Sequence, residues 1–500
     1  MNTERLTRDA GWLFLVVVLL PGCSREQQPT GPLNGQALAA IACAQCHTIP
    51  APSDMSREEW PYLLAWMGNY LGHPAEIEIH PALVAKHFVP PQPVVTREQF
   101  QAIQNYYLEQ APTQSQLPPP TPKPPVSALF QPLPFAINAA VISMVAFDPP
   151  NQALVVGLSR PAGMLVLQRG VTTPIAVTSE PVTFERLGEV CRIALMGHLG
   201  TDVRKGQIVD FNMQEGTRQI TVDAHPRIAA HRTADVDGDG KDDLLVCGFG
   251  DYPVGRVGIW WGATNTMTEQ VLFEEAGATW GDIADFDGDG DRDIVLIIAN
   301  NRPRIIAFAN EGGRHFIPRT VIERPVGWGY NRGLIVDWNG DGRPDLVETS
   351  GNNLELRGRP IKANHGVRVL QNEGEWKFRE VLFEPLHGAI DVAAGDFDGN
   401  GRADLAAVAF YPDWRLPVPM TFLLLLQRPD GSVERTGIDD QYWNRWMRIA
   451  AGDADDDGDT DILLGAAPVP LAIPAEHKAR YESLLQSKAN LVLLRNRKSP

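Results

Sequence analysis

The chain has 500 residues, of which 44% are hydrophobic, 21% charged and 8% aromatic, so it can bury a large core and is not disordered throughout. Its 45 glycines and 41 prolines favour many short strands and tight turns over a helical bundle. The net charge of −17 gives no electrostatic support for nucleic-acid binding.

Residues 1–22 have the pattern of a secretory signal peptide. Two arginines precede an apolar run from Trp12 to Leu20, which is too short to span a bilayer. The Leu-Pro-Gly-Cys sequence that ends at Cys23 resembles the lipobox of bacterial lipoproteins. This resemblance implies lipidation of Cys23, a tether over 23–33 and a place in the bacterial cell envelope, and Ser24 implies the outer membrane, on its periplasmic or surface face. A plain signal peptide with a coincidental cysteine is the alternative.

The segment from Cys43 to His47 reads Cys-Ala-Gln-Cys-His, the CxxCH pattern of covalent c-type haem attachment. Two thiols at this spacing bond the haem vinyl groups, and the adjacent histidine supplies an axial nitrogen to the iron. The histidine, the export signal and the lack of a second cysteine pair favour haem over zinc. We therefore predict one covalent haem c held by Cys43, Cys46 and His47.

Three short helices are expected around this motif, over 35–42, from about 56 through Met67, and over 96–110. Thr96 and Gln99 form a capping box at the start of the third helix. The stretch 34–112 resembles the small c-type cytochrome domain found ahead of calcium-loop propellers in bacterial surface proteins. The residues that carry this resemblance are Trp60, Met67-Gly68, Leu71-Gly72 and Tyr106-Tyr107.

The second axial ligand is predicted to be Met67, because a thioether would give a six-coordinate haem of relatively high potential. Packing in the helical core is the alternative role for this side chain. His73, His80 and His87 are competing ligands, and a bis-histidine haem would have a lower potential.

A proline-rich segment separates this domain from the rest of the chain. Seven of the fourteen residues from Pro112 to Pro125 are proline, which favours extended, semi-rigid geometry. We place a linker over 113–127.

One strand pattern recurs seven times after the linker, at the spacing of propeller blades, and an apolar β-rich strand precedes each occurrence. A closed ring lets every such unit bury both of its faces and leaves few exposed sheet edges. The sequence therefore predicts a seven-bladed β-propeller over 128–500. The recurring segments begin at Met164, Ile208, Val257, Ile305, Val367, Phe422 and Leu491.

The last five repeats each carry a nine-residue acidic loop, and the five loops together hold 22 Asp against four basic residues, a charge of −18. Oxygen ligands at positions 1, 3, 5 and 9, a backbone carbonyl at position 7 and glycine at position 6 match the preference of Ca²⁺. We predict a structural Ca²⁺ in each loop. The expected ligands are Asp235, Asp237, Asp239, Lys241 and Asp243; Asp285, Asp287, Asp289, Asp291 and Asp293; Asp337, Asn339, Asp341, Arg343 and Asp345; Asp396, Asp398, Asn400, Arg402 and Asp404; and Asp453, Asp455, Asp457, Asp459 and Asp461.

An EF-hand is the obvious rival for these loops, and the third loop satisfies the full EF-hand pattern because Glu348 falls at position 12. The other four loops fail it, and strand-like sequence follows every loop. The nine-residue loop followed by a strand resembles the FG-GAP/VCBS family, whose propellers include the integrin α-chain head. The resemblance covers about 136–500, and the first two repeats lack the loop.

Large side chains gather in the segments before the acidic loops. They would suit a ligand-binding rim at the mouth of the propeller, and packing between blades is the alternative. These residues are His231, Trp280, Trp328, Tyr330, His387, Trp443 and Trp446.

The predicted protein is mainly β, a seven-bladed propeller with a small all-α cytochrome c domain at its N-terminal side. We expect electron transfer through one haem, while the propeller binds a redox partner protein or a surface glycan or protein ligand. Two alternatives stay open: a propeller dehydrogenase that oxidises a sugar or alcohol with the haem as electron acceptor, and a surface adhesion protein. No hydrolase, nucleotide-binding or zinc-protease motif is present. Cys191 and Cys247 are either a disulfide or two separate thiols.

Overall fold

The computed structural model describes residues 34–74, 84, 89–138, 141–198, 203–212, 215–251, 254–262, 267–300, 302–353, 360–471, 473–487 and 489–497. The predicted signal peptide, the predicted lipidation site Cys23, the predicted tether over 23–33, and the candidate ligands His80 and His87 lie outside these residues. Within the described part of the chain, no helix combines the length and the apolar character needed to cross a membrane.

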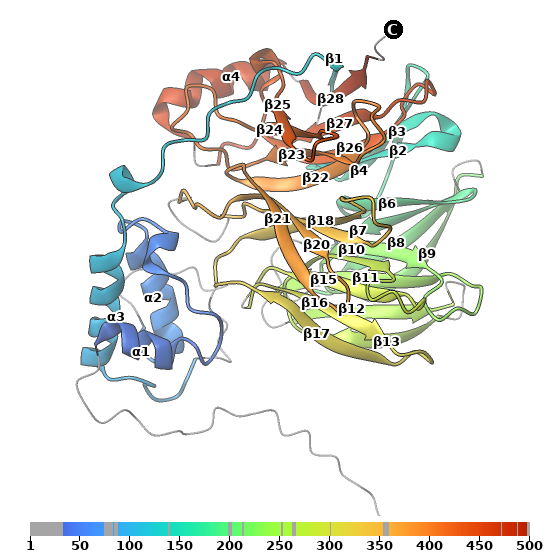
Figure 1. Cartoon of the computed structure of the whole chain (residues 1–500). Helices are drawn as coiled ribbons and strands as arrows, with labels where there is room; N and C mark the ends of the chain where they lie inside the picture. Colours follow the sequence, from blue (N-terminus) through green and yellow to red (C-terminus); the bar gives the residue numbers. More distant parts are fainter. Residues whose placement is uncertain are drawn as a thin grey trace, which may run out of the picture.

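Seven four-stranded antiparallel sheets form the larger part of the molecule (Figure 1). The innermost strand of each sheet contacts the innermost strand of the next, and β26 contacts β2, so the sheets close into a ring. The prediction of a seven-bladed propeller is confirmed. Each recurring segment of the sequence forms the third strand of its blade.

Each blade consists of four strands, named in sequence from the ring axis outward. The blades are β2 (Val141–Asp148), β3 (Ala153–Ser159), β4 (Gly163–Gln168) and β5 (Val171–Ile175); β6 (Pro181–Leu187), β7 (Val190–Leu195), β8 (Gly206–Asn212) and β9 (Thr217–His225); β10 (Ile228–Ala234), β11 (Asp243–Asp251), β12 (Val254–Trp261) and β13 (Thr268–Phe273); β14 (Ala278–Ala284), β15 (Asp293–Ile298), β16 (Arg304–Asn310) and β17 (Phe316–Glu323); β18 (Tyr330–Val336), β19 (Asp345–Ser350), β20 (Gly366–Asn372) and β21 (Phe378–Pro385); β22 (Ala389–Gly395), β23 (Asp404–Ala409), β24 (Phe422–Gln427) and β25 (Val433–Thr436); and β26 (Trp446–Gly452), β27 (Asp461–Ala466), β28 (Ala489–Asn496) and β1 (Phe130–Ala136).

The last blade takes its outermost strand from the beginning of the propeller. Strand β1 pairs antiparallel with β28, from Phe130 opposite Asn496 to Ala136 opposite Ala489. This pairing joins the two ends of the propeller sequence and closes the ring with main-chain hydrogen bonds. It also covers a sheet edge that would otherwise be exposed.

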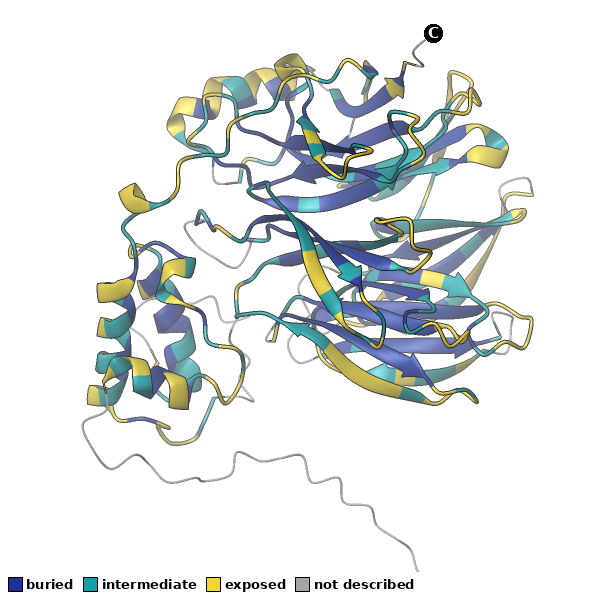
Figure 2. Ribbon diagram, viewed as in Figure 1, coloured by how far each residue is buried: buried dark blue, intermediate teal, exposed yellow. Residues whose placement is uncertain are grey.

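Seven hydrophobic clusters fill the seven interfaces between neighbouring blades. The second and third strands contribute most of the buried residues, whereas the outermost strands alternate with solvent; in β17, for example, four consecutive residues are exposed. Figure 2 shows this gradient from buried inner strands to exposed outer strands. The ring thus buries both faces of every blade, as the repeat pattern requires.

Three helices pack together beside the propeller (Figure 1): α1 (Gly35–Ala42), α2 (Trp60–Tyr70) and α3 (Arg97–Gln110). Trp60 and Tyr107 are buried in their shared core, with ring centroids 4.2 Å apart. Helix α1 crosses α3 at Gly35, where a Cβ atom would lie 2.0 Å from the Ala102 carbonyl oxygen. Only glycine allows the two helix backbones to approach this closely.

The proline-rich segment lies along the sixth blade. The Pro118 carbonyl accepts a hydrogen bond from Arg415 at 2.8 Å, and Val126 forms a parallel bridge with Gly437. These contacts fix the chain between the helices and β1. A fourth helix, α4 (Lys478–Ser487), follows β27, and its Tyr481 packs against Trp443.

Candidate functional site

The CxxCH segment follows directly after helix α1. The Asn34 side chain caps the start of this helix, and Cys43 is its C-terminal cap, with its N–H bonded to the Ala39 carbonyl. Cys43 is half-buried and packs against the helical core, whereas Cys46 is exposed. Burial raises the pKa of the Cys43 thiol to about 11, and the nearby Cys46 acts in the same direction.

The imidazole of His47 is oriented by a backbone hydrogen bond. Its Nδ1 donates to the Thr48 carbonyl at 3.0 Å, so Nε2 keeps its lone pair. Burial lowers the pKa of His47, which favours the neutral ring. A neutral imidazole held through Nδ1 is the arrangement in which histidine binds a metal through Nε2.

A cavity of about 500 Å³ adjoins this segment. Residues 44–49 form one side of it, including Cys46 and His47, and Arg302 and Glu323 of the propeller form the other. The two thiols and the oriented neutral histidine are the donors that a covalently attached haem requires. The size of the adjoining cavity also fits such a group.

Met67 lies on helix α2, half-buried, and packs against the same core as Cys43. Its role as an iron ligand stays a prediction. Its competitor His73 is already engaged, because its Nε2 lies 2.7 Å from the Val95 carbonyl and its ring stacks on Phe100. The backbone contact uses Nε2 alone, so His73 stays a competing ligand through Nδ1.

Each acidic loop connects the first and second strands of its blade, and all five fold in the same way. A side-chain oxygen of the Asp at position 1 accepts a hydrogen bond from the N–H of the glycine at position 6, at 2.8 to 3.0 Å. Positions 4 and 6 both have positive φ, and Asp456 is the single non-glycine among the ten. The carboxylates at positions 1, 3 and 5 converge in the first two loops, and those at positions 1, 3 and 9 converge in the last two, as in calcium-binding loops.

The Asp at position 9 is fully buried in every loop and joins the loop to the third strand. One carboxylate oxygen accepts from the N–H of position 2 and the other from an N–H at the end of the third strand. For Asp345 these donors are Trp338, at 2.9 Å, and Asn372, at 2.6 Å. The carboxylate therefore has a structural role besides any contribution to a cation site.

Carboxylate oxygens converge within 4.8 Å of one another in four of the five loops. In the first of them, Asp235 Oδ1 is buried and has no hydrogen-bond partner among the described residues. Burial raises the pKa of Asp293 and Asp404 to about 6, and neighbouring carboxylates add to this effect. A divalent cation bound in the loop would stabilise the ionised carboxylates and so counteract the rise in pKa from burial and from neighbouring charges. These oxygen donors therefore fit Ca²⁺.

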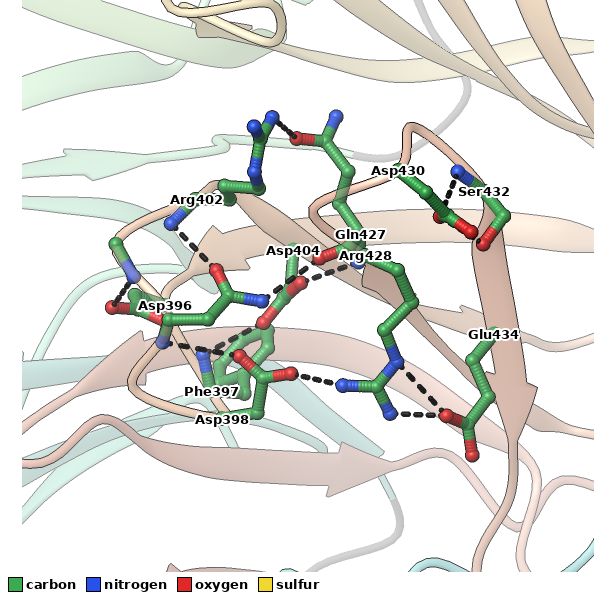
Figure 3. A network of polar contacts seen from close by, with 12 residues as sticks. Asp396, Phe397, Asp398, Arg402, Asp404, Gln427, Arg428, Asp430, Ser432 and Glu434 are labelled. Carbon is green, nitrogen blue, oxygen red and sulfur yellow. Dashed lines mark hydrogen bonds and ion pairs between the residues drawn. The ribbon is translucent and has the colours of Figure 1, made fainter.

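The sixth-blade loop illustrates the arrangement (Figure 3). Asp396, Asp398 and Asp404 converge there, and Arg428 forms ion pairs with Asp398 and Glu434. A nitrogen-bearing side chain likewise contacts the position 3 carboxylate in three other loops. These contacts are Arg314 with Asp237, Trp376 with Asp287, and Arg495 with Asp455.

An amide side chain at the end of the third strand was not singled out in the sequence, yet it joins neighbouring blades. The Asn372 amide donates to the Phe286 carbonyl of the preceding loop at 2.8 Å. Equivalent bonds join three other pairs of blades: Asn310 to Val236, Gln427 to Trp338, and Asn496 to Phe397. The recurrence of Asn or Gln at the end of the repeated strand is the signal that could have revealed this role.

Glu348, which completes the EF-hand pattern, belongs to strand β19 and is fully buried. It lies opposite Arg368 in the sheet and forms an ion pair with it, 3.3 Å between Oε1 and Nη1. The residue therefore lies within the blade as part of its core, and the following strand is inconsistent with an EF-hand helix.

Most of the large side chains before the acidic loops pack between blades, and Trp443 packs against helix α4, so they do not form an open rim. His231, Trp280, Tyr330, Trp443 and Trp446 are all buried. The two that are half-buried, Trp328 and His387, are also engaged: Arg324 and Arg368 lie against the Trp328 ring, and both nitrogens of His387 lie near backbone carbonyls.

The two propeller cysteines do not pair. Cys191 and Cys247 are separately buried thiols, in β7 and β11, so the disulfide alternative is wrong. Arg186 contacts the Cys191 sulfur, and Cys247 packs against Gly281 in the next blade.

Comparison with known proteins identifies the repeats. An FG-GAP-like repeat model matches residues 235–296 and 285–348, which contain the first three acidic loops. No curated protein matches the chain significantly. The chain therefore contains FG-GAP-like repeats within a seven-bladed propeller.

Several solved structures share a distant likeness. An auxiliary nutrient binding protein from Bacteroides thetaiotaomicron is 12% identical over 75% of this chain and 75% of its own, with a TM-score of 0.40. A calcium-binding protein, regucalcin, from Agrobacterium tumefaciens is 9% identical over 76% of this chain and 98% of its own, also with a TM-score of 0.40. Likenesses at this level carry no argument about the site or its ligand.

Proposed function

We propose that this protein is a c-type cytochrome joined to a calcium-stabilised propeller and held at the bacterial cell envelope through Cys23. In this proposal it passes single electrons between a donor and an acceptor protein. The observation that carries the proposal is the CxxCH segment, with His47 oriented through Nδ1 beside a cavity that the motif itself lines. When bound, a c-type haem supplies reversible one-electron transfer between its ferric and ferrous states.

The chain's own residues have separate roles in this proposal. Cys43 and Cys46 hold the cofactor covalently, and the Thr48 carbonyl keeps the His47 ring in place. Met67 would bind the haem iron together with His47. Trp60 and Tyr107 keep the helices together, since Trp60 Nε1 donates to the Pro52 carbonyl and the Tyr107 hydroxyl to the Pro50 carbonyl, close to the motif.

The acidic loops are proposed to bind up to five Ca²⁺ ions with a structural role. The loops place like charges close together, and a cation would neutralise them while the position 9 carboxylates join each loop to its blade. The propeller would then serve as a rigid platform that binds the redox partner. A surface glycan or protein ligand is the alternative to a redox partner as the molecule that the propeller binds.

Covalent haem attachment tests this function directly. The chain from Ser24 onward, produced with haem-attachment machinery, should gain the mass of one haem and show the spectrum of a low-spin c-type cytochrome. Cys46→Ala should lose one thioether bond, whereas Cys191→Ala, which removes a buried propeller thiol, should keep the haem. A wild-type chain without covalent haem would refute the proposal.

The same preparation tests Met67. The Met67→Ala variant should lose the ferric methionine–iron charge-transfer band and should bind carbon monoxide in the ferrous form, since an axial position would be open. Met55→Leu is the matched control, because Met55 is a buried core residue of the same helical unit. An unchanged spectrum in Met67→Ala would instead direct attention to His80 or His87. Reduction of the ferric haem when a sugar or alcohol is added would instead favour the alternative of a propeller dehydrogenase with the haem as electron acceptor.

A further inference from the structure

The cavity beside the CxxCH segment has walls from two distant parts of the chain. Six consecutive residues, 44–49, line one side, and Arg302 and Glu323 of the fourth blade line the other. Arg302 lies in the connection between β15 and β16, and Glu323 is the last residue of β17. No sequence pattern relates these two residues to the motif.

Glu323 connects the propeller to the motif by two contacts. Its Oε2 pairs with Arg302 Nη2 at 2.7 Å, and its Oε1 accepts a hydrogen bond from Thr48 Oγ1 at 3.1 Å. Thr48 is also the residue whose carbonyl orients His47. A continuous series of polar contacts therefore runs from Arg302 through Glu323 and Thr48 to the His47 ring.

Both charges of the pair lie on the cavity wall that faces Cys46 and His47, and they have opposite signs. The Arg302 charge also lies close enough to Cys46 to interact with it. Any cofactor bound between Cys46 and His47 would experience the same two charges.

We propose that the fourth blade forms one wall of the haem site, and that Arg302 and Glu323 set the reduction potential of the haem by opposing electrostatic effects. This inference rests on the proposed function. Ferric haem carries one more positive charge than ferrous haem. A nearby guanidinium therefore favours the ferrous form and raises the potential, and a nearby carboxylate lowers it.

The test is a potentiometric titration of the full haem-loaded chain, followed by its visible spectrum. Arg302→Gln should lower the potential and Glu323→Gln should raise it, each changing the ferrous-to-ferric ratio at fixed applied potential by about twofold or more. The double variant should return close to the wild-type value. Because the Arg302 side chain is half exposed, both shifts should shrink at high ionic strength.

Arg319→Gln provides the matched control. Arg319 lies on the same strand as Glu323 and its side chain is 46% exposed, compared with 50% for Arg302, but its partner is Glu311 and it does not line the cavity. This variant loses the same charge and should leave the potential unchanged.

The outcomes separate the two proposals. A chain that carries no covalent haem refutes the proposed function and this inference with it. A haem-loaded chain in which both variants match the wild-type potential, or in which both shift it in one direction, overturns the inference and leaves the cytochrome function intact. Comparable haem content and circular dichroism in each variant establish that the fold is retained.

Discussion

Asn372 lies at the end of β20, where its side chain joins the fifth blade to the fourth. The amide donates to the carbonyls of Phe286 and Pro344 at 2.8 and 3.3 Å, and its oxygen accepts from the Gly374 N–H at 2.9 Å. Replacing Asn372 with alanine removes all three bonds while leaving the backbone N–H that donates to Asp345. This substitution therefore measures the contribution of the amide, whose bond to Phe286 crosses between blades and whose other two bonds lie within the fifth blade.

The expected loss of unfolding free energy depends on the carbonyl groups that the substitution leaves without a hydrogen-bond partner. Phe286 is almost completely buried, so its carbonyl would lose its partner without access to water, at about 2 kcal/mol. The Pro344 carbonyl is less buried and its bond is longer, so we assign it about 1 kcal/mol, and water can replace the bond to Gly374. We expect Asn372→Ala to destabilise the propeller by about 3 kcal/mol.

Urea unfolding of the full chain in saturating Ca²⁺, followed by tryptophan fluorescence, measures this loss. The neighbouring Glu373→Ala is the control, because Glu373 is exposed and its ion pair with Arg379 contributes less than about 1 kcal/mol. If Asn372→Ala unfolds at the same urea concentration as Glu373→Ala, the amide bond does not hold the blades together and the reasoning is refuted.

Two further predictions concern the propeller. Burial raises the pKa of Glu348 to about 7, against the opposing effect of Arg368, so the folded state binds this proton more tightly than the unfolded state. The stability of the wild-type chain relative to Glu348→Gln should therefore fall as the pH rises from about 4.5 to about 7, by at most about 3 kcal/mol. If the difference in urea midpoint between the two proteins were the same at both pH values, the prediction would be contradicted. Chelation of divalent cations should lower the melting temperature, and added Ca²⁺ should restore it. Asp285→Asn should reduce the number of bound Ca²⁺ ions by one, whereas Asp430→Asn, an exposed turn residue outside the loops, should not; a melting temperature insensitive to chelation would refute a structural role for Ca²⁺.

The sequence alone predicted the seven blades, because each recurring apolar segment had to bury two faces and only a ring provides neighbours for all of them. The turn at the acidic loops could also be predicted from the sequence, since its Asp and Gly positions determine the local hydrogen bonds. Glu348 shows the limit of such patterns. Its position 12 matched an EF-hand, but its side chain is buried opposite Arg368 of the neighbouring strand, which the pattern does not specify.

Only the tertiary structure decided which distant segments meet. The pairing of β1 with β28, the amide bonds between blades and the separation of Cys191 from Cys247 all depend on ring closure. The contact of Thr48 with Glu323 spans 275 residues and depends on how the helices lie against the fourth blade. Local sequence specifies turns and strands because their hydrogen bonds are short in range, whereas these contacts arise only when complete blades and helices pack against one another.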